Sequence, residues 1–352
     1  MFIWQLALIK IMKKVLFFLI ILLQTLGYSQ VVGTPYITPP VEMQRLILDQ
    51  VSVTPSFAFS TRKLRTDYLG FAIRLRRSTD NAEVDVTFDT NGLISDNSVA
   101  KIAVSGTSGL AVNSTQTLAS FRSGATLFVT IWYDQGANGY HGVQTTTARQ
   151  PVFSLGVAGL TNQYASLVFT GSSKHNVTVN QTMPVLLGSG LRGSIMMLAR
   201  IQAGVSTNNS FGYSDTSDNN KRWSAHMNWP DNNNYTYTDF GSSTDASRYF
   251  LNDATVGFNK LKQYTMIRST TNKTVKVSGI TRQNNIALGV QSITWSAGST
   301  FGVGLTTGAL DISFNQNGFT GNIPEFILFP EALTVAQYST LENNQILFWG
   351  AF

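Results

Sequence analysis

The sequence has no cysteine among its 352 residues, so no disulfide can brace the fold and no lipid can be attached through a cysteine. A chain of around 300 residues can bury about 75% of the surface that its unfolded form exposes, so a core can stabilise it without such crosslinks. Charge is sparse too: Asp, Glu, Lys and Arg make up 12% of the chain, with 25 basic residues against 19 acidic ones. Three of the basic residues, Lys10, Lys13 and Lys14, lie in an apolar N-terminal stretch, which leaves 22 in the rest. This nearly equal number of basic and acidic residues argues against a nucleic-acid-binding protein.

Side chains that build common catalytic centres are few or dispersed. The three histidines, His141, His175 and His226, lie far apart in the sequence, and no serine stands in a Gly-x-Ser-x-Gly elbow. We therefore expect neither a zinc site nor a serine triad.

The N-terminal stretch has the features of a signal peptide. Lys13 and Lys14 precede the apolar run Val15–Leu23, and Gly27 and Ser29 are small residues suited to cleavage. A membrane anchor is the alternative, but each lysine would cost about 2.5–3.5 kcal/mol in the bilayer core. We therefore predict export, to the periplasm or the cell exterior, with no stable membrane span after cleavage.

The predicted organisation is a signal peptide at residues 1–29, a linker at residues 30–44 and one domain at residues 45–352. Met12 is an alternative start of translation. All-β sandwiches often run to about 200–250 residues as one domain, so a second domain is not required by the length.

Short β-branched and aromatic runs between Gly, Asn, Ser and Thr turns predict a large antiparallel sandwich. One convincing helix is expected at Thr334–Phe348 with Thr334 as its N-cap, and a single helical turn at Thr115–Ser120. Met43–Gln50 is a brief amphipathic stretch expected to pack on the sandwich. The expected strands are Gly70–Arg76, Val84–Asp89, Leu127–Tyr133, Ser166–Thr170, His175–Val179, Ser194–Ile201, Tyr235–Phe240, Leu261–Ser269, Thr274–Val277 and Phe326–Phe329.

Five segments carry a resemblance to a known family: Phe128–Pro151 (FVTIWYDQGANGYHGVQTTTARQP), Arg62–Phe88, Ala165–Gly171, Arg222–Gly241 and Gly321–Phe329. Together they resemble the concanavalin A-like (LamG-like) jelly-roll family, which includes the catalytic domain of fungal α-L-arabinofuranosidase B and many secreted Bacteroidetes proteins. The resemblance implies an all-β jelly-roll sandwich of two antiparallel sheets with a short C-terminal helix. It spans roughly residues 45 to 350 and is more specific for fold than for activity.

The segment from Arg222 to Phe240 has the composition of a sugar-binding site, because aromatic rings stack on sugar C–H surfaces while polar groups hold the hydroxyls. Strand alternation places Tyr235, Tyr237 and Asp239 on one face, a possible binding ledge. The alternative is that the aromatics are core and Asp239 ends a strand. The predicted ligand-binding residues are Arg222, Trp223, His226, Trp229, Tyr237 and Asp239.

Glycoside hydrolysis needs two carboxyl groups that flank the bond. Of the five glutamates, only Glu325 lies on a strand that could face a cleft. The resemblance to the arabinofuranosidase implies an acid/base within Gly302–Gly308, where Leu305 and Thr306 stand instead, and a nucleophile within Val205–Ser210, which has no glutamate. A secreted, lectin-like protein that binds a polysaccharide or surface glycan is therefore favoured. A divergent α-L-arabinofuranosidase and a non-catalytic structural or adhesive surface protein remain as alternatives.

No cofactor is expected, although a structural calcium ion is possible because oxygen-rich loops occur in such sandwiches. Asp134 with Asn138 is one candidate pair, and Asp134 is favoured as a cap of its own turn. The other candidate set is Asp215, Asp218 and Asn219.

Overall fold

The computed structural model describes residues 46–156, 164–204, 209–215, 218, 220–229, 235–242, 248, 250–252, 257–286, 288, 292–308 and 318–352. The chain divides into two units, Met1–Gln44 and Arg45–Phe352, and all of these residues belong to the second. The predicted signal peptide, the linker and Met43–Arg45 lie outside them. Within these ranges, no helix has both the length and the apolar character needed to cross a bilayer.

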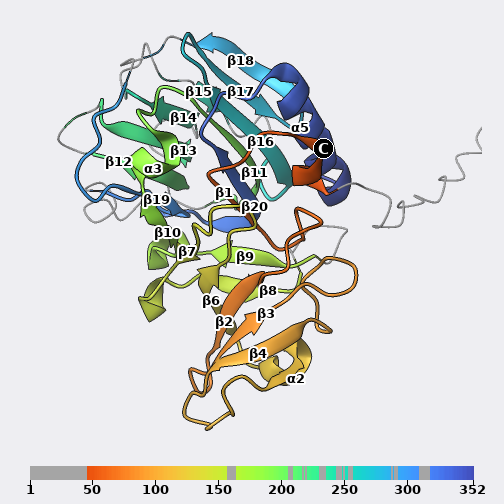
Figure 1. Ribbon diagram of the computed structural model, residues 1–352. Helices are drawn as coiled ribbons and strands as arrows, with labels where there is room; N and C mark the ends of the chain where they lie inside the picture. The colour runs from red at the N-terminus through yellow and green to blue at the C-terminus, as the bar shows by residue number, and fades with distance from the viewer. Residues whose placement is uncertain are drawn as a thin grey trace, which may run out of the picture. The chain divides into compact units, whose positions relative to one another are not determined.

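The described residues form an antiparallel β-sandwich with a C-terminal helix, which confirms the predicted fold class (Figure 1). In one sheet the strands follow the order β18 (Ile280–Ile286), β17 (Lys273–Val277), β16 (Leu261–Arg268), β11 (Gly193–Ile201) and β20 (Gly321–Phe329), with β1 (Phe57–Ser60) and β9 (Ser166–Phe169) both pairing with β20.

The other sheet contains the strands that carry the predicted ligand-binding residues. Its order is β15 (Phe250–Asn252), β14 (Tyr235–Phe240), β13 (Arg222–Trp229), β12 (Ser210–Ser214), β19 (Thr300–Val303), β10 (Val177–Thr182), β7 (Gly142–Val143), β6 (Leu127–Trp132), β2 (Ile73–Arg77), β3 (Glu83–Val86), β4 (Val99–Val104) and β5 (Thr115–Thr117). Strand β8 (Val152–Ser154) pairs with β6 and with β9 and so links the two sheets.

The core lies between the inward faces of these sheets. Met197 of β11 and Phe326 of β20 belong to one continuous buried cluster with Phe211 of β12 and Trp223 of β13. The rings of Phe211 and Phe326 meet edge to face with centroids 5.3 Å apart, a favourable arrangement for aromatic pairs. Since successive strand residues point to opposite faces, the neighbours of these core residues point away from it.

Helix α5 (Val335–Trp349) covers the outer face of the first sheet (Figure 1). The Thr334 hydroxyl accepts a hydrogen bond from the Gln337 backbone N–H, and the Gln337 side-chain oxygen accepts one from the Thr334 backbone N–H, so the predicted N-cap is part of a complete capping box. The helix buries Leu341 against Met196 and Ile327. The predicted helix at Thr334–Phe348 is therefore confirmed to within one residue at each end.

The remaining helices are short. They are α2 (Leu118–Arg122), α3 (Met183–Leu187), and the 3₁₀ turns η2 (Ile47–Gln50), η3 (Thr147–Arg149) and η4 (Gly171–Ser173). The helical turn predicted at Thr115–Ser120 begins later than expected, because Thr117 ends strand β5 and caps α2 through a bond from the Ser120 backbone N–H. Ile47 of η2 packs into the cluster beneath α5, as expected for the amphipathic stretch.

Candidate functional site

Strands β13 and β14 present a polar face on the side of the sheet away from the core. Ser224 lies directly opposite Asp239, and His226 lies opposite Tyr237, so all four side chains share that side. Arg222 is in the same alternation and reaches Asp239. We call Arg222, Ser224, His226, Tyr237 and Asp239 the β13–β14 polar face.

Asp239 is the centre of this face, and two arginines hold it. Arg248 donates from Nε and Nη2 to the two carboxylate oxygens at 2.8 and 2.9 Å, a two-pronged arrangement that fixes both groups. Arg222 Nη1 lies 3.7 Å from one of the same oxygens. The Asp239 side chain is fully buried, whereas those of Arg222 and Arg248 keep 12% and 17% of their surface exposed. The accessible part of the cluster is therefore the guanidinium pair.

Arg248 also lies over an aromatic ring. Its guanidinium carbon is 4.7 Å from the centroid of Tyr237, within cation–π range. Tyr235 meets Tyr237 edge to face at 6.4 Å and is half-buried. The row Tyr235, Tyr237 and Asp239 predicted from alternation thus lies on one side of β14.

Two further cations reach β14 from β16 and β17. Arg268 Nη1 donates to the Phe240 carbonyl, and Lys273 Nζ donates to the Thr238 carbonyl, each at 2.8 Å. Burial lowers the pKa of Lys273 to about 7, against the attraction of Asp239 and with added repulsion from Arg268 and Arg248. The neighbourhood of Asp239 is therefore rich in basic side chains.

His226 is buried within the polar face. Burial lowers its pKa to about 4; Asp239 opposes this shift, while Arg248 and Arg222 add to it. At neutral pH the imidazole is therefore neutral and keeps both a donor and an acceptor nitrogen.

The structure brings four of the six predicted ligand-binding residues together: Arg222, His226, Tyr237 and Asp239. Trp223 points the other way, into the core, where it stacks on Phe240 with centroids 3.9 Å apart. Its ring has no free face, so the expectation that Trp223 stacks on a sugar needs correction. The side chain of Trp229 lies outside the described residues. His226, Tyr237 and Asp239 are buried as well, so the expectation that these three touch the glycan directly also needs correction. Of the four, Arg222 keeps some exposed surface, and its contact with a glycan stays a prediction.

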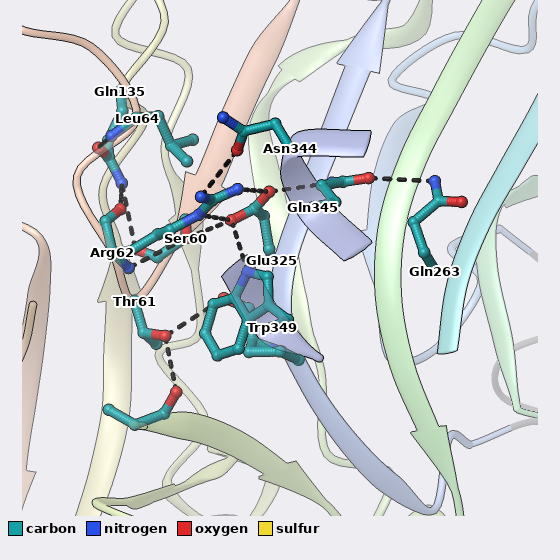
Figure 2. Close-up of polar contacts among 12 residues, drawn as sticks. Ser60, Thr61, Arg62, Leu64, Gln135, Gln263, Glu325, Asn344, Gln345 and Trp349 are labelled. Carbon is teal, nitrogen blue, oxygen red and sulfur yellow. Dashed lines mark hydrogen bonds and ion pairs between the residues drawn. The ribbon is translucent and has the colours of Figure 1, made fainter. Parts of the chain in front are cut away.

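Glu325 is not available for catalysis. It is fully buried, and Arg62 binds both of its oxygens, at 2.7 and 3.1 Å (Figure 2). Although burial alone raises the pKa of Glu325, the Arg62 charge and its hydrogen bonds hold that pKa below its usual range. Figure 2 shows the rest of its shell, in which Ser60, Gln345 and Trp349 each donate to the carboxylate. This network joins β1, β20 and α5.

The segment Gly302–Gly308, where the resemblance implies an acid/base, holds no carboxylate. Leu305 and Thr306 are buried there, and the Thr306 backbone N–H donates to the Ser210 hydroxyl at 3.0 Å. Residues 205–208, which fall in the segment implied to hold the nucleophile, lie outside the described residues, as does Asp311. Near the polar face, Asp215 accepts a hydrogen bond from Ser296.

The calcium candidates are engaged in other contacts. Asp134 accepts backbone N–H groups of Ala58 and Gly136 at 2.7 Å and of Tyr140 at 3.0 Å, so it caps its own turn and ties it to β1. Asn138 donates its side-chain N–H to nearby backbone carbonyls. Asp215 and Asp218 are described but Asn219 is not, and the described residues contain no cluster of three or more metal-ligating side chains.

A separate open pocket of about 290 Å³ lies beside the loop between α3 and β11. It contains no residue of the β13–β14 polar face. Its lining residues are Leu187, Gly188, Ser189, Leu191, Arg192, Pro330 and Glu331.

Comparison with known proteins finds similarity in structure and none in sequence families. No protein-family model matches the chain, and no curated protein matches it. Among solved structures, an arabinofuranosidase complexed with arabinofuranosyl-α-1,2-xylobiose superposes with a TM-score of 0.58 at 11% identity. A GH54 α-L-arabinofuranosidase soaked with a cyclic sulfate inhibitor gives 0.57 at 12% identity. Both matches cover 86% of this chain and 64% of the other. The chain thus shares the fold of these arabinofuranosidases and spans less than two thirds of their length.

Proposed function

We propose that the protein is an exported, lectin-like protein that binds a polysaccharide or a surface glycan through the β13–β14 polar face. The observation that carries this proposal is the pair Arg222 and Arg248, which share the buried carboxylate of Asp239 and keep part of their own surface exposed. Donors fixed in this way can hydrogen-bond sugar hydroxyls without losing much side-chain freedom on binding.

The roles within the site follow from burial. Arg222, Arg248 and half-buried Tyr235 would meet the glycan. Asp239 would act as a positioning residue that holds the two arginines, and His226 would support the face from beneath. Stacking by Trp229 remains part of the proposal.

The first alternative is an arabinofuranosidase-type hydrolase, which the shared fold favours. A retaining glycosidase needs two carboxyl groups about 5–5.5 Å apart, one of which must carry a proton. Asp239 is poorly suited to either role because Arg248 occupies both of its oxygens.

The second alternative is a structural or adhesive surface protein with no small ligand. Full burial of Trp223 and near-complete burial of His226 favour it, since neither side chain can touch a ligand directly.

A glycan array run beside an assay for release of 4-nitrophenol from its α-L-arabinofuranoside separates these functions. Glycan retention without release supports the proposal. Release of 4-nitrophenol would show a hydrolase, and a negative result in both assays would leave the structural role. An array with the Arg222→Gln variant then locates the site, because retention should fall with that change.

A further inference from the structure

We propose that the glycan recognised by the β13–β14 polar face is acidic, and that Arg222 and Arg248 bind a carboxylate or a sulfate on it. This inference rests on the proposed function and names the chemical class of the ligand.

The first argument is the ratio of charges at the site. Two guanidinium groups share one carboxylate, that of Asp239. No other ion pair of either arginine is found in the described part of the chain. The carboxylate of Asp215 also attracts Arg222, but only Asp239 forms an ion pair with the two guanidinium groups among the described residues, at a place where both arginine side chains are largely removed from water.

The second argument is the number of unused donors. Arg248 spends Nε and Nη2 on Asp239, which leaves Nη1. Arg222 spends Nε on the Asp215 carbonyl at 3.2 Å and turns Nη1 toward Asp239, which leaves Nη2. Each of these two nitrogens carries two N–H donors, so the two guanidinium groups together offer donors to two oxygens of one anion. The two remaining nitrogens suit a carboxylate or sulfate better than a lone hydroxyl.

The third argument is the field around the site. Arg268 and Lys273 are buried against the backbone of β14; Arg268 adds a positive charge near Asp239, and Lys273 adds one when it is protonated. A neutral sugar would leave this excess uncompensated, whereas an anionic sugar would offset it. Attraction of an anion into a partly desolvated cationic site also falls with added salt, which gives a second observable.

Three sugars that differ only at carbon 6 test this inference on the unaltered protein. Galactose, galacturonic acid and galactose 6-sulfate compete for binding of the purified protein to the glycan that it retains best on the array. We expect galacturonic acid, galactose 6-sulfate or both to compete at a concentration at least about tenfold lower than galactose, the difference that one charge-assisted hydrogen bond supplies. The more potent of the two acidic sugars identifies the anion. Raising NaCl from 50 to 300 mM should weaken competition by that acidic sugar and leave competition by galactose unchanged.

Two substitutions locate the effect. Arg248→Gln should weaken binding of the acidic glycan by about tenfold or more, and Arg248→Lys should weaken it less, because the charge stays while the fork is lost. Arg65→Gln is the control, since it removes the same charge from an exposed pair with Asp67. The affinity of the Arg65→Gln variant for the acidic glycan should stay within twofold of that of the wild type.

The outcomes separate the two claims. Equal competition by galactose and galacturonic acid, with galactose 6-sulfate no better, overturns the acidic-ligand inference and leaves glycan binding intact. If neither neutral nor acidic glycans are retained, the proposed function itself fails. If Arg248→Gln does not fold by circular dichroism, the competition series on the wild-type protein still decides.

Discussion

Arg62 and Glu325, 263 residues apart in the sequence, form an ion pair from which water is excluded, with side chains 4% and 0% exposed. Asn344 of α5 accepts a further hydrogen bond from Arg62 at 2.9 Å. A buried pair of this kind is costly to break, because the remaining charge loses its partner without regaining water. Together with Ser60 of β1, which also donates to Glu325, the pair couples the first strand, the closing strand and the C-terminal helix.

Glu325→Gln should lower the free energy of unfolding by about 3–5 kcal/mol, because Arg62 is left as a buried, uncompensated cation. Urea denaturation measures the effect. Glu331→Gln, an exposed glutamate just beyond β20, is the matched control and should change stability by less than about 0.5 kcal/mol. Equal effects for the two substitutions would show that the Glu325 network does not hold α5.

Stability should fall as the pH is lowered from about 6.5 to about 4, in part because of His226. Its pKa is about 4 in the folded protein and about 6.5 when unfolded, so between these values only the unfolded chain binds the proton. Full protonation of His226 in the folded protein would lower the free energy of unfolding by about 3 kcal/mol. Urea midpoints of wild type and His226→Asn across this range should diverge, with the variant less sensitive to acid. Parallel curves would contradict the buried, neutral imidazole.

Trp223→Phe should reduce stability by about 2 kcal/mol through lost packing on Phe240 and leave the glycan dissociation constant within twofold. Thermal unfolding and binding measured on the same sample separate the two effects. A tenfold loss of affinity at unchanged stability would restore Trp223 to the ligand site.

Gly212→Ala tests the close approach of β12 to β13. Gly212 has φ +99°, and a Cβ there would lie 2.3 Å from the Trp223 carbonyl oxygen. Gly109→Ala is the control, since Gly109 also has positive φ, +68°, but open space around it. We expect a loss of about 1 kcal/mol for Gly109→Ala and at least about 3 kcal/mol for Gly212→Ala, read from urea denaturation. Similar losses would mean that β12 can move away from β13.

The fold could be predicted from the sequence because strand composition, turn residues and one well-capped helix agree. Tyr235–Phe240 alternates aromatic and polar residues and is strand β14 at the predicted bounds. Strand β19, Thr300–Val303, was not predicted, since a short run containing Gly302 has little local strand preference. Its strand conformation comes from pairing with β10 and β12.

The site could be predicted only in part. The composition of Arg222–Phe240 groups Trp223 with Arg222 and His226, whereas alternation along β13 places Trp223 on the opposite face from these two residues. Arg248 was missed because it follows Asp239 by nine residues, beyond the end of the strand, and no local spacing rule joins the two. The signal for Arg248 in the sequence is its position shortly after Asp239, an aspartate near the end of a strand.

Hydrogen–deuterium exchange with and without a retained glycan tests the central claim most directly. The account predicts slower exchange of backbone amides in β13, Arg222–Trp229, and β14, Tyr235–Phe240, on binding. Protection confined to the pocket lined by Arg192 and Glu331, with β13 and β14 unchanged, would contradict it and place glycan binding elsewhere on the sandwich.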